Sequence, residues 1–364
     1  MYKIGVSGSL SNYFFSESVK ALSQNNVIIS NIDAPDLDFI FCVNDVRPTI
    51  KNSKIPIVTW IGERPTWLYL WKQFNSRCAD LIFLTEKDFV EPVKKLVGHN
   101  NVYFLPLATS FKTNYIQQKS YKYEISFVGN TMQKQITDME EEKTAFLKLP
   151  LKNNDCIRIK DQIKNLNFNN LDNTIYDLIN KLSSAKQYIL DFNNYSDIRQ
   201  DLLYGYMGMI LTQNRRIFIL SGLFRLFPNI ILRPSDWNDF INEATVDERI
   251  AYENINKFYF DSMININISS MHMPSSLNSR VFDVPINGSF LLTDYRDGIY
   301  DLFENDEIVT YHSLNELIEY IDFFKTNEAA RTKIINKSLR RIDNSHRYSN
   351  RISFILEKFQ NSLG

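Results

Sequence analysis

The residues best suited to chemistry lie in the segment 278–294, which reads NSRVFDVPINGSFLLTD. Arg280 and Asp283 are three residues apart, so a helix would place their side chains on one face. Gly288 lies where the helical pattern gives way to an apolar strand, as a helix-ending glycine does. A guanidinium, a carboxylate and free backbone amides beside such a turn are suited to binding a sugar nucleotide.

These residues also have purely structural interpretations. Arg280 and Asp283 could form a surface ion pair, which contributes roughly a few tenths of a kcal/mol. Gly288 could simply stop the helix, and Asn278 could cap its start. We favour ligand binding for Arg280, because a guanidinium neutralises charge that builds on a diphosphate. Asp283 could equally accept hydrogen bonds from a ribose, and Ser289 could offer an amide and a hydroxyl to a phosphate.

Short strands and helices must bring such residues to one edge of a sheet. Over about the first 110 residues, apolar runs alternate with amphipathic segments. The expected strands are 3–6, 27–30, 39–43, 57–60, 81–84 and 102–105, and the expected helices are 14–23, 68–76 and 87–96. Alternation with such short connections predicts a parallel, doubly wound sheet, whose ligands bind at the carboxyl ends of its strands.

The remainder of the chain predicts a second sheet after a polar linker. Its expected strands are 125–130, 229–233, 264–268, 291–294 and 308–310, and its expected helices are 253–262, the segment after Asn278, 314–325, 328–343 and 349–361. The region 150–194 is expected to be mostly helical. The most apolar run, 217–227, is interrupted by Gly222 and Arg225 and predicts a core strand or helix rather than a membrane-dipping element.

Composition favours a two-domain protein with ordinary cores. The chain has 364 residues, of which 44% are hydrophobic and 23% charged, and its net charge of -1 gives no general sign of nucleic-acid binding. Cys42, Cys78 and Cys156 form neither a disulfide framework nor a zinc pattern, which favours the cytoplasm. The four histidines have no metal-ligand spacing.

The sequence shows no signal peptide and no apolar window long enough to predict a spanning helix.

Four segments in order resemble the spore-maturation-protein (CgeB-like) glycosyltransferases, which are relatives of the group 1 glycosyltransferases with the GT-B fold. They are IPIVTWIGERP at 55–65, ADLIFLTEKDFVEPVKKLVGHNNVYFLPLAT at 79–109, YEISFVGN at 123–130, and a long stretch from about 254 to 351 that includes SMININIS and SHRYSNR. The chain differs from the family where Asp283 and Val284 replace Glu-Ala, and where Asn287, Gly288 and Ser289 replace a small residue and paired glycines. We expect Pro285 to end its helix early.

The resemblance implies an α/β GT-B architecture in which two Rossmann-like domains face each other across a cleft. The expected divisions are an acceptor-side domain at 1–112, a linker at 113–122, a donor-binding domain at 123–345, and a C-terminal helix at 346–364 that packs back on the first domain. It also implies transfer without a catalytic metal ion. No cofactor is expected, because the nucleotide sugar is a co-substrate.

Several other polar residues follow predicted strands. Glu63 could act as general base towards an acceptor hydroxyl, bind an acceptor, or support its turn. On the donor side, Arg233 could reach a phosphate or base, His272 could contact sugar or phosphate, and Trp237 could stack on a base or belong to the core. The acceptor-side candidates are Ser7, Gly8, Asn44, Asp45 and Arg64.

The expected function is transfer of a sugar from a nucleoside-diphosphate-sugar to a hydroxyl-bearing acceptor, which could be a glycan, a protein or another molecule. The alternatives are a non-catalytic nucleotide- or carbohydrate-binding protein and a sugar-nucleotide epimerase or phosphorylase. Lys333, Lys337, Arg340 and Arg341 share one helical face, which is either a solvated surface or a platform for an anionic membrane or acceptor.

Overall fold

The computed structural model describes residues 1–8, 12–25, 27–44, 54–64, 79–115, 120–141, 160–161, 163, 166, 168, 198–241, 245–246, 250–273 and 275–362. Three sequence predictions lie outside these residues: the candidate Asp45, the helix at 68–76, and most of the region 150–194.

The first domain contains a six-stranded parallel sheet with the order β2-β1-β3-β4-β5-β6. Its strands are β1 (Tyr2–Ser7), β2 (Val27–Ser30), β3 (Phe39–Val43), β4 (Ile57–Ile61), β5 (Leu81–Leu84) and β6 (Val102–Phe104), and its helices are α1 (Tyr13–Ser23), the 3-10 turn η1 (Lys87–Phe89) and α3 (Val90–Val97). Every residue of β3, β4 and β5 is buried, as expected of parallel strands covered on both faces. The side chain of Asn12 caps α1 by accepting from the N–H of Phe14.

The second domain also contains a six-stranded parallel sheet, with the order β12-β11-β10-β7-β8-β9. Its strands are β7 (Tyr123–Val128), β8 (Ile231–Arg233), β9 (Thr245–Val246), β10 (Ser262–Asn267), β11 (Leu291–Asp294) and β12 (Val309–Tyr311). Its helices are α4 (Gln133–Glu140), α7 (Ile198–Leu226), α8 (Ile255–Phe260), α9 (Arg280–Ile286), α10 (Leu314–Thr326) and α11 (Glu328–Ser345), with 3-10 turns η2 (Ser235–Asp239), η3 (Tyr252–Asn254) and η4 (Ile299–Asp301). The predicted α/β class with two parallel-sheet domains is therefore confirmed.

Three local predictions differ from the structure. The apolar run 217–227, which fitted a strand or a helix, belongs to the long helix α7. Pro285 lies inside α9 and does not end it, since the helix continues to Ile286. The predicted helix 253–262 is shorter, because η3 and α8 end at Phe260 and Ser262 already begins β10.

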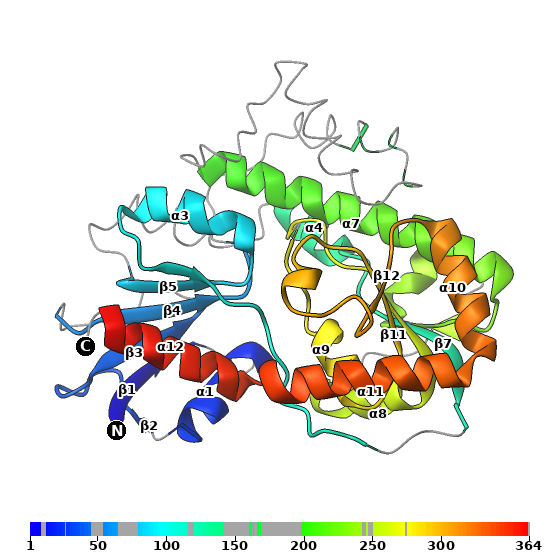
Figure 1. Cartoon of the computed structure of the whole chain (residues 1–364). Helices are drawn as coiled ribbons and strands as arrows, with labels where there is room; N and C mark the ends of the chain where they lie inside the picture. The colour runs from blue at the N-terminus through cyan, green and yellow to red at the C-terminus, as the bar shows by residue number, and fades with distance from the viewer. Residues whose placement is uncertain are drawn as a thin grey trace.

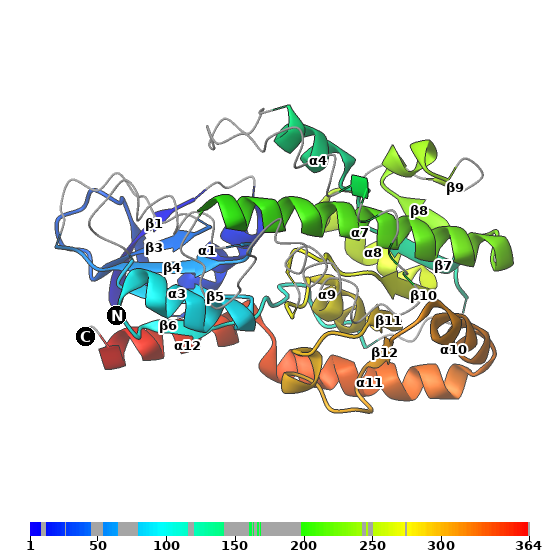
Figure 2. The ribbon, with the colours of Figure 1, turned by 90° about the horizontal axis from the view of Figure 1, so that it is seen from above.

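Three long helices, α7, α11 and α12 (Tyr348–Ser362), run between the two domains. The helix α7 extends above both sheets, as the two perpendicular views show (Figures 1 and 2). The helices α11 and α12 run in succession below them, and α12 returns to the first domain. There Ile352, Ile355 and Phe359 pack in one apolar cluster with Phe14 of α1 and Trp60 of β4.

In the described part of the chain, no helix combines the length and apolar character needed to cross a membrane.

Candidate active site

The first sheet reverses its strand order between β1 and β3, and ligands of open parallel sheets bind at the carboxyl ends of strands at such a point. Ser7 ends β1, Gly8 follows it, and Asn44 follows β3, so three acceptor-side candidates lie at this switch point. Asn44 has a left-handed φ of 52°, and its side-chain oxygen accepts from the N–H of Gly62 at 2.7 Å. Asn44 thereby fixes the loop that presents Glu63.

Glu63 is exposed to solvent, although surrounding protein atoms reduce its solvation. This loss of solvation by nearby protein atoms raises the pKa of the Glu63 carboxyl above its usual value. A carboxyl that is accessible and yet poorly solvated is a reasonable general base, because its pKa moves towards neutrality while a hydroxyl group can still approach it.

The two domains meet around Tyr13, the first residue of α1. Its hydroxyl is hydrogen-bonded to Ser279 and interacts electrostatically with Asp283 and Arg280 of the second domain and with Glu63 of its own domain. The side chains predicted for the donor and for catalysis therefore approach the same boundary from opposite sides.

Arg64 is a buried contact between the domains. It is 7% exposed, its Nη1 donates to the carbonyl oxygen of His272 at 3.1 Å, and its guanidinium lies 5.0 Å from the ring centroid of Phe89. Burial, with Arg64 and other nearby guanidinium groups, lowers the pKa of His272 to about 3, so this imidazole is neutral. A neutral imidazole beside several cations adds no further charge to the site.

The second sheet reverses its order between β7 and β10, and the guanidinium of Arg216 lies at this switch point. Arg216 extends from α7 and is 2% exposed. Its Nη1 donates to the carbonyl oxygen of Asn130 after β7 at 2.6 Å, and its Nη2 donates to that of Ile268 after β10 at 3.0 Å. Burial, and next the nearby Arg280, lower the pKa of Arg216 to about 9, which still leaves it charged at neutral pH.

Arg280 begins α9 and is anchored by amide side chains. Its Nε donates to Oδ1 of Asn267 at 2.8 Å, and Asn278 donates to the same oxygen at 2.9 Å. Between Arg280 and Asp283 the structure has no ion pair, so the surface salt-bridge interpretation is wrong. Among the described residues, neither terminal nitrogen of Arg280 has a hydrogen-bond partner, and these nitrogens are therefore available to a ligand.

Asp283 lies inside the packing between the domains and is 0% exposed. The Tyr252 hydroxyl donates to its Oδ2 at 3.1 Å, and the Tyr252 ring stacks between those of Tyr13 and Phe111, at 4.3 and 4.9 Å. Burial raises the pKa of Asp283 to about 7, although hydrogen bonds from neighbouring hydroxyl groups and the charge of Arg280 oppose this shift. A ribose could reach this carboxyl only if the surrounding aromatic residues moved.

Gly288 and Ser289 do not lie beside Arg280. Gly288 has a left-handed φ of 71° and follows the C-terminal end of α9, and Ser289 is buried just before β11. A helix that begins at the carboxyl edge of a parallel sheet must return to the amino edge before the next strand begins. The predicted phosphate-binding amides are therefore at the opposite edge of the sheet from Arg280.

Arg233 and Trp237 take part in packing. The Arg233 guanidinium lies 4.5 Å from the ring centroid of Phe258 in α8. Trp237 is 0% exposed, and its indole N–H donates to the carbonyl oxygen of Gly129 at 2.7 Å. Its core interpretation is thus correct, and base stacking is not available to it.

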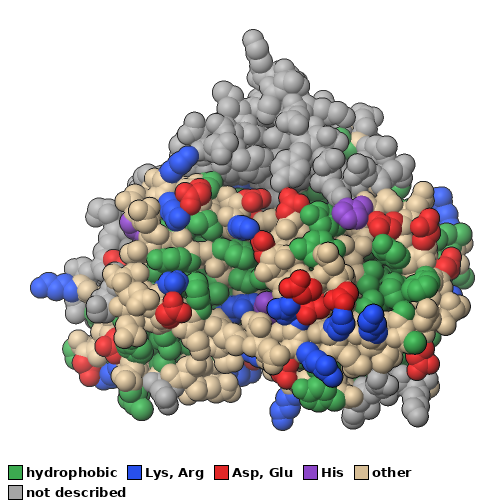
Figure 3. All heavy atoms as spheres, viewed as in Figure 1, with side chains coloured by type: hydrophobic (Ala, Val, Ile, Leu, Met, Phe, Trp, Pro, Cys, Tyr) green, Lys and Arg blue, Asp and Glu red, His purple; other side chains and the backbone are tan. Residues whose placement is uncertain are grey.

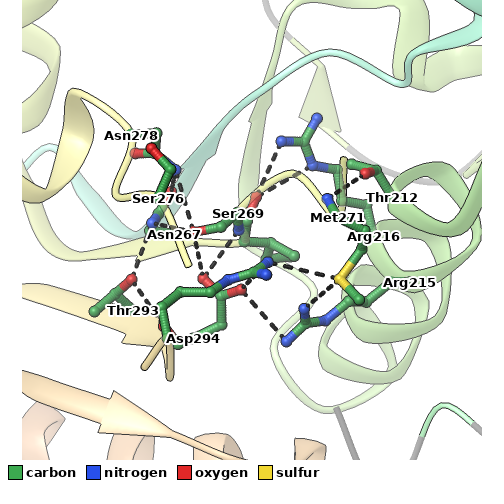
Figure 4. A network of polar contacts seen from close by, with 12 residues as sticks. Thr212, Arg215, Arg216, Asn267, Ser269, Met271, Ser276, Asn278, Thr293 and Asp294 are labelled. Carbon is green, nitrogen blue, oxygen red and sulfur yellow. Dashed lines mark hydrogen bonds and ion pairs between the residues drawn. The ribbon is translucent and has the colours of Figure 1, made fainter. Parts of the chain in front are cut away.

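A buried charged cluster that the sequence interpretation missed surrounds Asp294, at the end of β11 (Figure 4). Asp294 accepts from Arg296 at 3.1 Å and lies 3.3 Å from Nη2 of Arg215, and Ser269 donates to it through its N–H and its hydroxyl, both at 2.9 Å. Burial would raise the pKa of Asp294, but Arg296, Arg215 and these hydrogen bonds hold it below its usual value. Arg215 also donates to Met271 Sδ at 2.8 Å.

This cluster together with Arg280 gives the carboxyl edge of the second sheet an excess of positive charge. Four guanidinium groups, those of Arg215, Arg216, Arg280 and Arg296, face one ionised carboxylate, that of Asp294. The adjacent arginines 215 and 216 within an apolar helix were a signal in the sequence, because buried charges are rare without partners or ligands. Such an excess suits an anion of high charge, such as a diphosphate.

A separate hollow lies away from the candidate residues. This hollow of about 600 Å³ lies where η4 and the junction of α11 and α12 approach β6, and it is lined by Lys87, Pro106, Asp301, Arg351 and neighbouring residues. None of the candidate residues lines it. Within the described ranges, no group of three or more His, Cys, Asp or Glu side chains is arranged as a metal site.

The chain was compared with known proteins by sequence and by structure. Residues 213–357 match the family model described as glycosyl transferase-like, and this stretch contains all four arginines of the cationic edge. None of the curated proteins searched matches the chain.

Among solved structures, the chain is similar to the β-glucosyltransferase of phage T4, with a TM-score of 0.52, 9% identity and 100% coverage of both chains. A DNA-modifying β-glucosyltransferase studied with and without uridine diphosphoglucose also gives a TM-score of 0.52, with 10% identity and 100% coverage of both. The Anabaena protein HepE in complex with UDP and glucose gives 0.50, with 10% identity and coverage of 99% of this chain and 100% of that one. The chain therefore has the two-domain GT-B fold of glycosyltransferases, and its residues 213–357 are similar to the glycosyl transferase-like family.

Proposed function

We propose that this protein is a glycosyltransferase that moves a sugar from a nucleoside-diphosphate-sugar to a hydroxyl-bearing acceptor. The observation that carries the proposal is the excess of guanidinium groups at the switch point of the second sheet, with the accessible Glu63 on the facing domain. The glycosyl transferase-like match over 213–357 supports it, because this match covers the cationic edge.

The donor diphosphate would bind the terminal nitrogens of Arg280, and the buried guanidinium of Arg216 would add positive charge behind it. As the bond between the anomeric carbon and the diphosphate oxygen breaks, negative charge grows on that oxygen, and preorganised guanidinium groups stabilise it. In an inverting reaction Glu63 would take the proton of the acceptor hydroxyl while its oxygen attacks the anomeric carbon. Ser7, Gly8 and Asn44, at the switch point of the first sheet, would line the acceptor side.

Several finer features belong to the same proposal. We propose a hexose-like donor sugar, no resident cofactor and no catalytic metal ion, because guanidinium groups can supply the positive charge that a divalent cation supplies elsewhere. We also propose the CgeB-like subtype, on the four resembling segments of the sequence. We propose a cytoplasmic location, because the buried Cys42 of β3 forms no disulfide within the described part of the chain.

Peripheral contact with an anionic membrane through α11 is the last part of the proposal. Lys337 pairs with Asp306, and Arg341 pairs with Glu304 and Glu307. Acidic and basic side chains accordingly alternate over the face seen in Figure 3. Lys333 and Arg340, which are exposed on α11, would have to make the contact, and binding to anionic vesicles that is lost in a double alanine variant would test it.

The main experiment is titration calorimetry with a panel of nucleoside diphosphates, followed by assays of donor hydrolysis and transfer. Nucleotide binding with turnover of one nucleotide sugar supports the proposal. Binding without turnover would indicate a non-catalytic binding protein, and epimerisation of the free donor would indicate an epimerase. A protein that binds none of the nucleotides would contradict both the transferase and the epimerase and would leave only a carbohydrate-binding protein among the alternatives.

A further inference from the structure

The segment 268–279, which joins β10 to α9, crosses from the second domain to the first. We call it the crossing loop. Its backbone at His272 accepts from Arg64 at 3.1 Å, and the Met273 side chain packs in an apolar cluster of the first domain beside Cys42 and Ile61. A loop of the donor-binding domain therefore makes polar and apolar contacts with the other domain.

The strongest of these contacts is made by Glu86, which follows β5 of the first domain. Its side chain is 0% exposed. One carboxylate oxygen accepts from the N–H of Ser276 at 2.9 Å, and both oxygens lie within 3.2 Å of the N–H of Ser275. The Ser275 hydroxyl also donates to Glu86. One carboxylate thus satisfies two consecutive backbone amides on the opposite domain.

An ionised carboxylate in this buried position costs folding free energy. Burial raises the pKa of Glu86 to about 7, and the nearby Asp88 raises it further, although the backbone amides of the loop oppose the shift. Buried charges contribute little net stability compared with apolar residues of similar size. A stabilising role alone therefore explains Glu86 poorly, and its partners indicate what else it does.

The amides that Glu86 holds lie immediately before the residues proposed for the donor. Asn278 is two residues after Ser276, and Asn278 shares the side-chain oxygen of Asn267 with Arg280. The other end of the crossing loop is anchored within the second domain, because Ser269 donates to Asp294. Met271 is also held within the second domain, because its N–H donates to the hydroxyl of Thr212 in α7 at 2.7 Å. The amides of Ser275 and Ser276, nearest the start of α9, are those held by Glu86 of the first domain.

We propose that Glu86 is a positioning residue: through Ser275 and Ser276 it holds the crossing loop in the conformation that places Asn278 and Arg280 for the donor diphosphate. The donor site of the second domain is then complete only when the first domain is docked against it. The identity of the ligand rests on the proposed function, whereas the ordering of the loop by Glu86 does not.

The test compares Glu86→Ala and Glu86→Gln in the full chain with Lys87→Ala as the matched control. Lys87 is the next residue and also bridges the domains, but its ion pair with Asp301 is exposed, at 56% and 43%. Amide hydrogen exchange of peptides covering 268–282 is measured without ligand, and the affinity for UDP and GDP is measured by calorimetry. Glutamine keeps one carbonyl acceptor, so Glu86→Gln remains folded and informative if the alanine variant does not fold.

We expect Glu86→Ala to increase exchange in 268–282 roughly 10-fold or more, since two buried amides lose their acceptor. The affinity of Glu86→Ala for the bound nucleotide should fall by a similar factor. In both the exchange rate and the affinity, Glu86→Gln should lie between Glu86→Ala and wild type. Lys87→Ala should match wild type in both measurements. Unchanged exchange in both Glu86 variants would overturn the proposal, as would faster exchange with unchanged nucleotide affinity. If the wild type binds neither UDP nor GDP, the affinity is measured with the other nucleoside diphosphates of the panel. If it binds none of them, the proposed donor class fails, and the exchange data alone support or overturn the ordering of the loop.

Discussion

Arg280 donates from Nε to Oδ1 of Asn267 at 2.8 Å, although Asp283 lies only one turn further along the same helix. The amide holds the guanidinium without neutralising it. A carboxylate in the same position would cancel the charge and occupy the terminal nitrogens. The anchoring by Asn267 therefore keeps a positive charge ready for an anionic ligand.

Replacing Arg280 should abolish most turnover without unfolding the protein. For Arg280→Ala we expect kcat to fall about 10²- to 10³-fold, the usual effect of removing one preorganised charge stabiliser. Arg280→Lys keeps the charge but cannot bind a phosphate with a planar pair of nitrogens, and it should be intermediate. Steady-state kinetics with the donor identified by calorimetry measures both, and Lys257→Ala, an exposed change on α8, is the control. Normal turnover of folded Arg280→Ala would exclude the diphosphate assignment.

The sequence predicted all six strands described in the first sheet and five of the six described in the second, missing only the two-residue edge strand β9. Most of their strands are short, largely apolar runs such as FIFCV in β3 and LIFL in β5, and parallel strands buried on both faces must have this composition. The polar residues at the ends of such runs, among them Asn44 and Glu63, could be located for the same reason. Strand order, and with it the two switch points, came only from the structure.

The remaining features of the site depend on distances that a sequence does not contain. Gly288 and Ser289 are close to Arg280 in sequence, but α9 carries them to the opposite edge of the sheet. Glu86 and Ser275 are 189 residues apart and yet in contact. Arg216 was hidden within an apolar helical pattern, and only its contacts with Ile268 and Asn130 reveal that it lies at the switch point.

Glu63 predicts a specific pH dependence. A general base must be ionised to accept a proton, so kcat should rise with pH through the pKa of Glu63, which burial raises above the usual glutamate value. Glu63→Gln should remove this acidic limb and lower kcat about 10²- to 10⁴-fold. The pH–rate profiles of both proteins test this prediction. Glu91→Gln, a change on the exposed side of α3, is the control, and an acidic limb that persists in Glu63→Gln would assign the base to another group.

Asp294 should be essential for stability. In Asp294→Asn the buried Arg215 and Arg296 lose their counter-charge, and breaking such a pair costs about 3–5 kcal/mol. The folded pKa of Asp294 lies below its usual value, so its contribution is present at neutral pH and is lost as the pH falls through the folded value. Urea unfolding measured in steps from pH 7 downwards should show a large difference between wild type and variant at pH 7 that shrinks as the carboxyl of folded Asp294 becomes protonated. The exposed change Asp322→Asn should have little effect at any pH, and an equally small effect of Asp294→Asn would contradict the prediction.

Asp283 should show the opposite pH dependence. Its folded pKa of about 7 exceeds the ordinary value of 3.8, so its contribution to stability is full below the ordinary value and is lost as the pH rises towards 7. Asp283→Asn removes the charge and keeps an oxygen that can accept from Tyr252. Between pH 5 and the folded pKa of about 7 the wild type loses about 1.4 kcal/mol of this contribution per pH unit, so the stability of Asp283→Asn relative to wild type should rise by about 3 kcal/mol from pH 5 to pH 8. Tyr252→Phe removes a hydrogen bond that favours the ionised form and should therefore destabilise the protein more at pH 8 than at pH 5. Urea unfolding of the three proteins at both pH values tests this, and a difference between Asp283→Asn and wild type that does not change with pH would show that Asp283 titrates normally.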